Sequence, residues 1–452
     1  MTGPSYGRPG DGDGASLGLP QAPGARLTVT GGRAAYLIRD FLTRNRIGFD
    51  YADSDDDGGD PAVPRCVLPD GTTLDNPTVA ELAARLGLVR AASRSRYDLV
   101  VIGAGPAGLA AAVYASSEGL ATAVVEPSAP GGQAGTSSRI ENYLGFPDGI
   151  SGAELADRAR RQAERLGAEL LLARDVVAGD VRDGRFVVGL SDGAELLAGA
   201  VLTASGVDWR RLEADGVERL LHAGVYYGAA ASEAPGTRGK NVFVVGAGNA
   251  AGQAASAFAD FAGTVTLLVR GDDPRASMSA YLLDRLLLAP NVRIRTNVTV
   301  ESVEGDDWLR RVVVRSTDGT IKALEAHALF ICIGGEPRTA WASRDGIALD
   351  PQGYVLAGPD LPRPLIECGW ALERDPYLLE SSRPGLFVAG DIRHGSTKRV
   401  ATAVGEGAMA VQFIHRHLQD QQDPRTDAGR DDAATSAGGR SSTAPVTPSE
   451  LL

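Results

Sequence analysis

Cysteine is scarce in this chain of 452 residues, which contains only Cys66, Cys332 and Cys368. No two of them form a C-x-x-C pair, so the sequence excludes a local redox dithiol and a clustered cysteine site, and no metal is predicted. Cys332 lies in the apolar run 328–333, which is typical of a buried strand. We therefore interpret it as a small, inert core residue.

Long apolar runs and excess positive charge are also lacking. No run approaches the roughly 20 residues that a membrane span needs, so no membrane association is predicted. The Gly/Pro-rich residues 1–24 have no apolar core and do not resemble a signal peptide, which favours a cytoplasmic protein. A net charge of −12 makes nucleic acid an unexpected partner.

Histidine is rare as well, with five residues in the whole chain. His394 follows Asp391 in a loop and is a candidate proton donor, although a structural role is equally favoured. No other side chain stands out as a general acid or base, so no catalytic residue is assigned.

Glycine, by contrast, is abundant, and much of it lies in two strand–loop–helix motifs that begin after the apolar runs 97–102 and 241–245. Such a turn brings backbone N–H groups and a helix N-terminus close to a pyrophosphate. Two of these motifs in one chain predict two dinucleotides, a flavin and a nicotinamide. The residues expected at the two pyrophosphates are Gly103, Gly105, Pro106, Ala107, Gly108, Gly246, Gly248, Asn249 and Ala250.

The charged residues after the next strand of each motif distinguish the two sites. Glu126 ends the apolar run 121–125, where a carboxylate accepts hydrogen bonds from a free ribose diol, as in FAD. Arg270 ends the second such run, with Arg275 close behind, and a guanidinium there pairs with the 2′-phosphate of NADPH. The alternative is that these are ordinary charged loop residues.

The ends of the chain and its first hundred residues differ from the rest. Residues 1–25 and 419–452 are low-complexity segments, and we predict disordered tails there. Residues 26–91 form a separate small α/β module in the order strand, helix, strand, strand, helix. Its predicted elements are strands at 26–30, 47–52 and 64–68, and helices at 34–44 and 79–86.

Several further elements complete the main body. The Gly-rich polar connection 130–147 is long enough to predict a functional loop. A capped amphipathic helix follows at 151–166, and a small meander of strands at 169–202. The apolar strand 385–391 delivers the carboxylate of Asp391, and a helix follows at 400–418.

In these motifs the chain resembles the pyridine nucleotide–disulfide oxidoreductases, specifically the low-molecular-weight thioredoxin reductase type. The resemblance implies an α/β, three-layer fold with two Rossmann-like dinucleotide-binding domains, and a homodimer. It places an FAD-binding domain at 96–212 and 337–418, with an NAD(P)H-binding domain at 213–336. The matching stretches, in the family's order, are 103–108, 131–133, 141–147, 246–254, 330–335 and 385–391.

The same resemblance implies further flavin contacts. Gly132, Gln133 and Asn142 line the flavin, and Asp391 after Gly390 hydrogen-bonds a ribityl hydroxyl. The helix that begins at Val400 and Ala401 directs its N–H groups at the carbonyl edge of the flavin, where its dipole favours negative charge.

The chain departs from this family where thioredoxin reductases carry C-x-x-C, because Gly228 and Ala231 stand there. The N-terminal module resembles a thioredoxin/glutaredoxin-like fold, but 32–35 (Gly-Arg-Ala-Ala) occupies the position of its dithiol. Segments 370–379 and 393–406 are similar to those of thioredoxin reductase-like proteins without the dithiol. The chain therefore has neither the dithiol of the NAD(P)H-binding domain nor that of the N-terminal module to carry electrons.

These observations predict an FAD-dependent NADPH oxidoreductase that passes electrons to a non-dithiol acceptor. The acceptor is a small organic substrate, a quinone, oxygen or a redox protein. Two alternatives stay open, a thioredoxin-disulfide reductase and a non-catalytic flavin-bound sensor or interaction protein.

Overall fold

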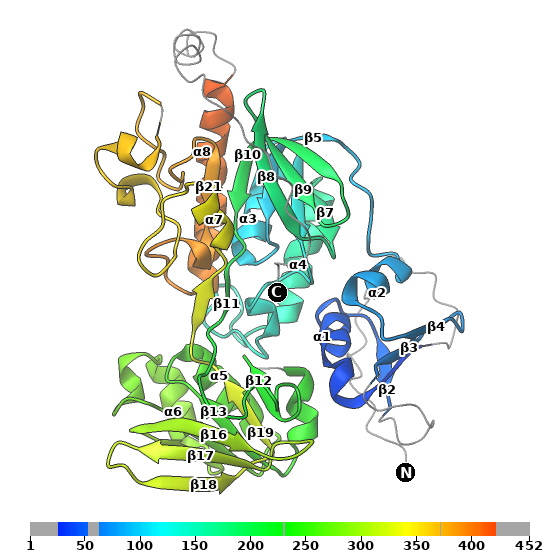
Figure 1. Cartoon of the computed structure of the whole chain (residues 1–452), viewed down its shortest axis with the longest axis vertical. Coiled ribbons are helices and arrows are strands. Elements are labelled where there is room, and N and C mark those ends of the chain that lie inside the picture. Colours follow the sequence, from blue (N-terminus) through cyan, green and yellow to red (C-terminus); the bar gives the residue numbers. More distant parts are fainter. Residues whose placement is uncertain (1–25, 53–62, 229–230, 371, 422–452) are drawn as a thin grey trace.

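The computed structural model describes residues 26–52, 63–228, 231–370 and 372–421. They form an N-terminal module, an upper body built on a seven-stranded sheet, and a lower body built on a five-stranded and a three-stranded sheet (Figure 1). The predicted tail 1–25 and most of the predicted tail 419–452 lie outside the described residues.

The N-terminal module is a four-stranded sheet of order β2-β1-β3-β4, with β1 and β2 parallel and the other pairs antiparallel. Its helices bury Phe41 and Leu82 against the sheet, and Thr78 caps the second helix with Glu81 in a capping box. The prediction missed β4, a short strand after the turn at Gly71. The elements are β1 Leu27–Thr30, α1 Tyr36–Arg44, β2 Phe49–Tyr51, β3 Arg65–Val67, β4 Thr73–Asp75 and α2 Val79–Arg85.

The upper body unites two distant segments of the chain, because β21 (Leu386–Val388) pairs in parallel with β10 (Glu195–Thr203). Strands β7, β6, β5 and β10 run side by side in parallel, and β9 and β8 extend the sheet in antiparallel fashion. Helices α3 and α8 pack closely against each other. The remaining elements are β5 Arg96–Ile102, α3 Pro106–Ser117, β6 Thr122–Glu126, α4 Gly152–Arg165, β7 Glu169–Leu172, β8 Val176–Arg182, β9 Arg185–Leu190, α7 Ala340–Arg344 and α8 Val400–Asp420.

The lower body is a parallel sheet of order β12-β19-β13-β14-β15 with an antiparallel sheet β16-β17-β18 beside it. Its parallel strands are apolar on both faces because each face is buried under other elements. The elements are β12 Val225–Tyr227, β13 Asn241–Val245, α5 Asn249–Ala259, β14 Thr264–Leu268, α6 Ala280–Leu288, β15 Val292–Arg295, β16 Val298–Glu304, β17 Arg311–Ser316, β18 Ile321–Glu325 and β19 Ala328–Ile331.

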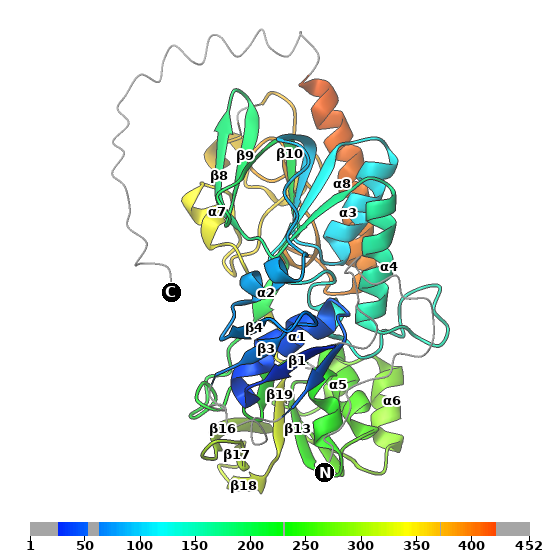
Figure 2. The same ribbon diagram turned by 90° about the vertical axis from the view of Figure 1, so that its right-hand side faces the viewer.

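A narrow antiparallel ribbon connects the two bodies. It consists of β11 (Val207–Trp209) and β20 (Gly335–Pro337). The glycine at 335 is required by packing, since a Cβ there would lie 2.4 Å from the Val207 side chain. The N-terminal module lies beside the junction that this ribbon spans (Figures 1 and 2).

These sheets confirm the predicted fold class, and two local predictions need correction. Strand β7 is not part of a meander, because it pairs in parallel with β6 at the edge of the main sheet. Helix α8 continues to Asp420, so residues 419 and 420 are helical rather than part of a tail. Within the described residues, no helix has both the length and the apolar character needed to cross a membrane.

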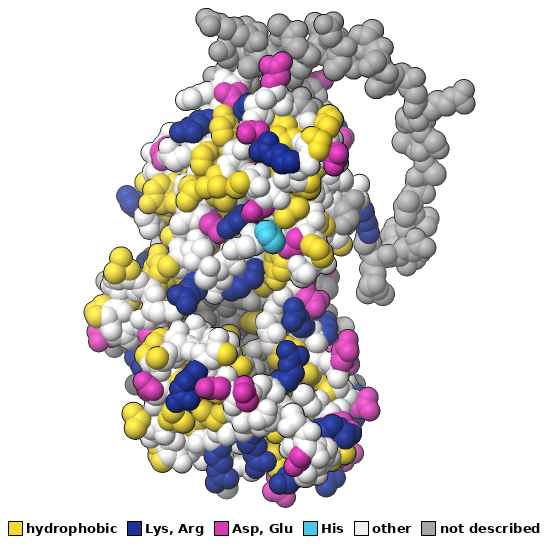
Figure 3. Space-filling view, turned by 90° about the vertical axis from the view of Figure 1, so that its left-hand side faces the viewer, with side chains coloured by type: hydrophobic (Ala, Val, Ile, Leu, Met, Phe, Trp, Pro, Cys, Tyr) yellow, Lys and Arg dark blue, Asp and Glu magenta, His cyan; other side chains and the backbone are white. Residues whose placement is uncertain are grey.

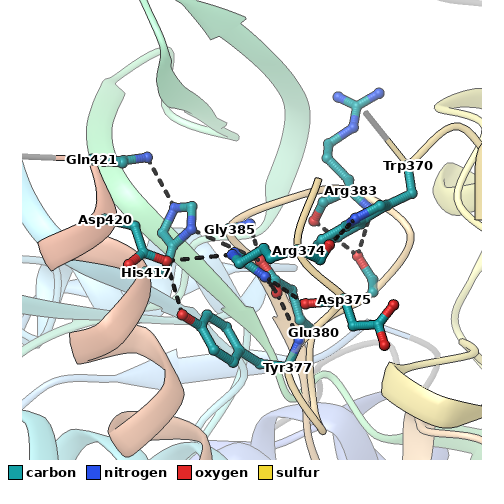
Figure 4. Close-up of polar contacts among 11 residues, drawn as sticks. Trp370, Arg374, Asp375, Tyr377, Glu380, Arg383, Gly385, His417, Asp420 and Gln421 are labelled. Carbon is teal, nitrogen blue, oxygen red and sulfur yellow. Dashed lines mark hydrogen bonds and ion pairs between the residues drawn. The ribbon is translucent and has the colours of Figure 1, made fainter. Parts of the chain in front are cut away.

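A buried polar network fixes the segment that leads into β21 (Figure 4). Glu380 is fully buried and accepts two hydrogen bonds from Arg374, at 2.7 and 3.0 Å. It also accepts the backbone N–H of Gly385 at 2.9 Å, directly before β21. His417 of α8 lies 3.8 Å away, and its burial lowers its pKa. The network therefore links the segment before β21 to α8.

Candidate functional site

A cavity of about 1010 Å³ lies where the carboxyl ends of the upper strands face the lower body. The face of the molecule opposite the N-terminal module is hollowed between the two bodies (Figure 3). The cavity brings together residues of both predicted sites. The predicted residues that line it are Gly103, Gly105, Pro106, Ala107, Glu126, Gly132, Gln133, Asn142, Gly390, Asp391, Val400, Asn249 and Ala250.

The other predicted residues do not line the cavity, and two of them serve the packing of the loops. A Cβ at Gly108 would lie 1.9 Å from the carbonyl oxygen of Gly103, and one at Gly246 would lie 2.3 Å from that of Cys332. Gly108 therefore lets α3 approach the loop at Gly103 closely, and Gly246 lets its loop pass close to the end of β19. The predicted residues outside the lining are Gly108, Ala401, Gly246, Gly248, Arg270 and Arg275.

The first glycine loop leaves open space where its helix begins. Gly103 turns the chain with φ of +99°, which favours glycine, and Gly105 is the N-cap of α3. A Cβ at Gly105 would meet no other atom within 4 Å. A Cβ on Gly132 would stand 3.2 Å from Gly105, so only small residues fit beside this helix end. The loop therefore offers bare N–H groups to an anion.

Glu126 is held rigidly at the end of β6. Its carboxylate accepts the N–H groups of Ala104 at 2.9 Å and Ser128 at 3.0 Å, and the residue is only 7% exposed. Burial raises its pKa, although both N–H groups oppose that shift. A carboxylate has further lone pairs beyond these two bonds, and those remain for a ligand.

Asp391 is presented to the cavity by a second fixed loop. Glu406 of α8 accepts the N–H of Gly390 at 2.7 Å and a hydrogen bond from Arg393 at 2.6 Å. Burial raises the pKa of Asp391, and the ammonium group of Lys398, which also lines the cavity, opposes this shift. In the described structure the Asp391 carboxylate receives no hydrogen bond, which leaves it free to accept one from a ligand hydroxyl.

Three buried polar atoms on cavity-lining residues also have no hydrogen-bond partner in the described structure. They are the hydroxyls of Thr203 and Ser205 and the Nε of Arg44. Buried polar groups are normally satisfied, so unsatisfied groups at a cavity wall fit a polar ligand. The sequence reasoning had not selected these residues. Thr203 and Ser205 could have been found as the polar tip of an apolar strand.

The second glycine loop is less complete. The side-chain oxygen of Asn249, at the start of α5, already accepts a hydrogen bond from the backbone N–H of Ser279 at 2.7 Å. Arg270 is exposed, with no hydrogen bond or ion pair to any described residue. Arg275 is 69% exposed and lies 3.5 Å from Asp273. Neither guanidinium is therefore fixed in position by buried hydrogen-bonding partners among the described residues.

The family model of the pyridine nucleotide-disulphide oxidoreductases matches residues 97–407 of this chain. The chain belongs to the pyridine nucleotide-disulphide oxidoreductases. It is an FAD-dependent NAD(P)H oxidoreductase, and FAD and NADPH are the cofactors of its thioredoxin reductase-like branch. The open glycine loop, Glu126, Asp391 and the unsatisfied hydroxyls fit a dinucleotide of this kind.

Similar proteins of this oxidoreductase family include thioredoxin reductases. The "Bifunctional thioredoxin reductase/thioredoxin" of Mycobacterium leprae is 34% identical over 71% of this chain and 66% of its own length. The thioredoxin reductase of Listeria monocytogenes is 31% identical over 72% and 94%. Among solved structures, T. acidophilum thioredoxin reductase has a TM-score of 0.64 at 26% identity, with 73% of this chain and all of that chain covered.

The oxidoreductase has no room for a larger side chain at Gly228, the position at which the family resemblance places the first cysteine of C-x-x-C. Gly228 lines the cavity with φ of +75°, and a Cβ there would lie 2.6 Å from the Trp209 ring. A cysteine at this position would have to displace the indole. Trp209 was not selected from the sequence, because only the folded ribbon brings it against Gly228.

Two of the three cysteines, Cys66 and Cys332, are buried thiols. Cys332 belongs to the core of the lower body, as predicted, but it also lines the cavity. Burial raises the pKa of its thiol to about 12, and that of Cys66 to about 11. Neither group is a thiolate near neutral pH.

His394 lies outside the cavity lining and hydrogen-bonds Asp350 at 2.6 Å. This contact favours the structural alternative for that residue over proton donation to a ligand. In the part of the chain that the structure describes, no group of three or more His, Cys, Asp or Glu side chains is arranged to hold a metal ion.

Proposed function

We propose that this oxidoreductase transfers electrons from NADPH through FAD to an acceptor other than a disulfide of its own chain. FAD supplies the two-electron chemistry, and the chain binds, orients and encloses it. The observation that supports the proposal is one cavity that most of the predicted flavin-binding residues line. Gly228, which the resemblance places at the family's dithiol, lines the same cavity and packs closely against Trp209.

The upper body is the proposed FAD-binding domain, with residues 96–212 and 337–418. The start of α3 at Gly105 holds the pyrophosphate, and Glu126 accepts the ribose hydroxyls. Asp391 accepts a ribityl hydroxyl, since its carboxylate accepts no hydrogen bond from any described residue. The flavin itself is lined by Gly132, Gln133, Asn142, Thr203, Ser205 and Val400 at the start of α8. Ala401, the next residue of α8, lies outside the cavity lining and contributes at most its backbone N–H.

The lower body is the proposed NADPH-binding domain, with residues 213–336. The start of α5, where Gly248 is the N-cap, receives the second pyrophosphate. Arg270 pairs with the 2′-phosphate, and Arg275 is an additional candidate. The exposed position of both arginines is compatible with a ligand that binds and leaves in each turnover.

The acceptor is a small organic substrate, a quinone, oxygen or a redox protein. Rapid mixing of the holoenzyme with NADPH under anaerobic conditions tests whether NADPH is the electron donor. We expect the absorbance band of oxidised flavin, at about 450 nm, to be lost as the flavin is reduced. Steady-state NADPH oxidation with oxygen, quinones and thioredoxin then tests the acceptor side. No flavin reduction by NADPH would contradict the proposal.

One alternative has a specific observation in its favour. The relatives at 31–34% identity are named thioredoxin reductases, which supports reduction of thioredoxin. That reaction requires a dithiol between flavin and thioredoxin, and the three cysteines here are unpaired. The non-catalytic alternative, a flavin-bound sensor, is distinguished by an absence of flavin reduction.

We propose two further features of the chain, a glutaredoxin-like module and a homodimer. Residues 26–91 form the proposed glutaredoxin-like module, whose strand order β2-β1-β3-β4 and mixed pairing support that comparison. A homodimer is proposed from the resemblance alone. Sedimentation velocity on the full chain tests it, and a single species of monomer mass would contradict it.

A further inference from the structure

The N-terminal module contacts both bodies at the edge of the cavity. On the lower body, Tyr36 stacks on His222 with ring centroids 4.1 Å apart, and Arg39 lies 3.3 Å from Glu233, both side chains largely buried. On the upper body, Arg44 and Arg46 at the end of α1 reach across. The module is therefore seated against the nucleotide site.

Among the described residues of this module, Arg44 is the one that lines the cavity. Its Nη2 donates to the carbonyl oxygens of Ala129 and Gly132, each at 3.3 Å. These contacts place the guanidinium beside the loop in which Gly132 closely approaches Gly105. Arg44 therefore lies near the start of α3, the expected pyrophosphate position.

The guanidinium has donor capacity that the protein does not use. Of its five N–H groups, those on Nη2 make long bonds, and Nη1 lies 3.6 Å from Asp40. The Nε is buried without a partner. Glu126 lies within electrostatic range, so the cation is held close to the acidic end of the site. A bound anion would accept a hydrogen bond from the unused donor capacity of this cation.

We propose that Arg44 is a phosphate-binding residue of the FAD site, contributed by the N-terminal module. The inference rests on the FAD site proposed above and adds a role for the module. Although the module lacks a dithiol, it completes the cofactor site and links cofactor binding to its own docking on the upper body.

The experiment compares full-length wild type with Arg44→Gln and Arg44→Lys, and with Arg46→Gln as the matched control. Arg46 is two residues away, pairs with Asp157 at 3.5 Å, and does not line the cavity. Apoprotein is titrated with FAD, with ADP and with adenosine, and dissociation constants are measured by flavin fluorescence and by competition. Thermal unfolding of each apoprotein shows whether it is folded.

We expect Arg44→Gln to raise the dissociation constants of FAD and ADP by roughly tenfold to a hundredfold, as for loss of a charge-assisted hydrogen bond. The dissociation constant of adenosine, which has no phosphate, should stay unchanged. Arg44→Lys should retain part of the affinity, and Arg46→Gln should stay within about twofold of wild type. Equal FAD affinity in Arg44→Gln and wild type would overturn the inference. Equal weakening of adenosine would do so as well, because it would show a packing role. A wild type that binds no FAD would instead contradict the FAD site itself.

Discussion

In the upper body, Glu126 at the end of β6 is 7% exposed and accepts hydrogen bonds from two backbone N–H groups. In the lower body, by contrast, Arg270 after β14 is exposed and bonded to no described residue. The upper loop also has Asp391 and unsatisfied hydroxyls around it. The difference fits a cofactor that stays bound in one site and a nucleotide that exchanges in the other. A prebuilt site lowers the ordering cost of binding, which matters most for a resident group.

The largest test of this comparison exchanges the second glycine of each loop for valine. Neither position is crowded, since a Cβ at Gly105 meets nothing within 4 Å and one at Gly248 meets an oxygen only at 4.0 Å. Gly105→Val should therefore fold but purify without FAD. Gly248→Val should keep its FAD and lose reduction by NADPH. Absorbance spectra and rapid mixing check both, and a yellow Gly105→Val protein would show that the first loop is not the FAD site.

A smaller effect is expected at the prebuilt carboxylate. Glu126→Gln removes the charge that accepts the ribose hydroxyls, so the FAD dissociation constant should rise roughly tenfold. Glu118→Gln, at the far end of α3, is the control and should bind FAD as the wild type does. An unchanged FAD affinity in Glu126→Gln would mean that Glu126 only holds the loop together.

Arg270 is expected to affect the choice between NADPH and NADH, and not the binding of FAD in the upper body. Arg270→Ala should reduce the preference for NADPH over NADH by roughly tenfold to a hundredfold, measured as the ratio of kcat/KM values. Arg275→Ala should have less effect, since that side chain already lies near Asp273. If the wild type uses NADPH and NADH equally, Arg270 is a solvated loop charge.

The smallest effect concerns the thiol that lines the cavity. Cys332 has a pKa raised to about 12, and only a thiolate reacts with iodoacetamide. Its alkylation in the folded apoprotein should therefore be negligible near neutral pH and should increase only as pH rises toward that value. Peptide mass spectrometry measures the modification. Rapid labelling at pH 7 that FAD prevents would identify a reactive thiol in the flavin site.

The sequence predicted the parts of the site that depend on local patterns. The glycine loops follow from a strand–turn–helix spacing, and Glu126 and Asp391 follow from carboxylates at the ends of apolar strands. Patterns of this kind involve residues close together in the sequence, so they can be recognised without knowledge of the tertiary fold.

The missed residues depend on long-range packing. Arg44 reaches the cavity only because a separate module docks on the upper body, and no local pattern around α1 predicts that contact. Trp209 fills the space at Gly228, a contact between β11 and the residue after β12 that no local pattern predicts. Strand β4 is three residues long, too short for a periodic signal, and forms because β3 offers it a free edge.

The central claim is that no protein dithiol stands between FAD and the acceptor, and the electron capacity of the holoenzyme tests it most directly. Anaerobic titration of the wild type with dithionite, followed by flavin absorbance, should reach its end point after two electrons per FAD, the capacity of the flavin alone. The variant in which Cys66, Cys332 and Cys368 are all replaced by Ala should give the same end point. Uptake of four electrons per FAD by the wild type, reduced to two in the cysteine-free variant, would reveal a redox-active disulfide and contradict the account.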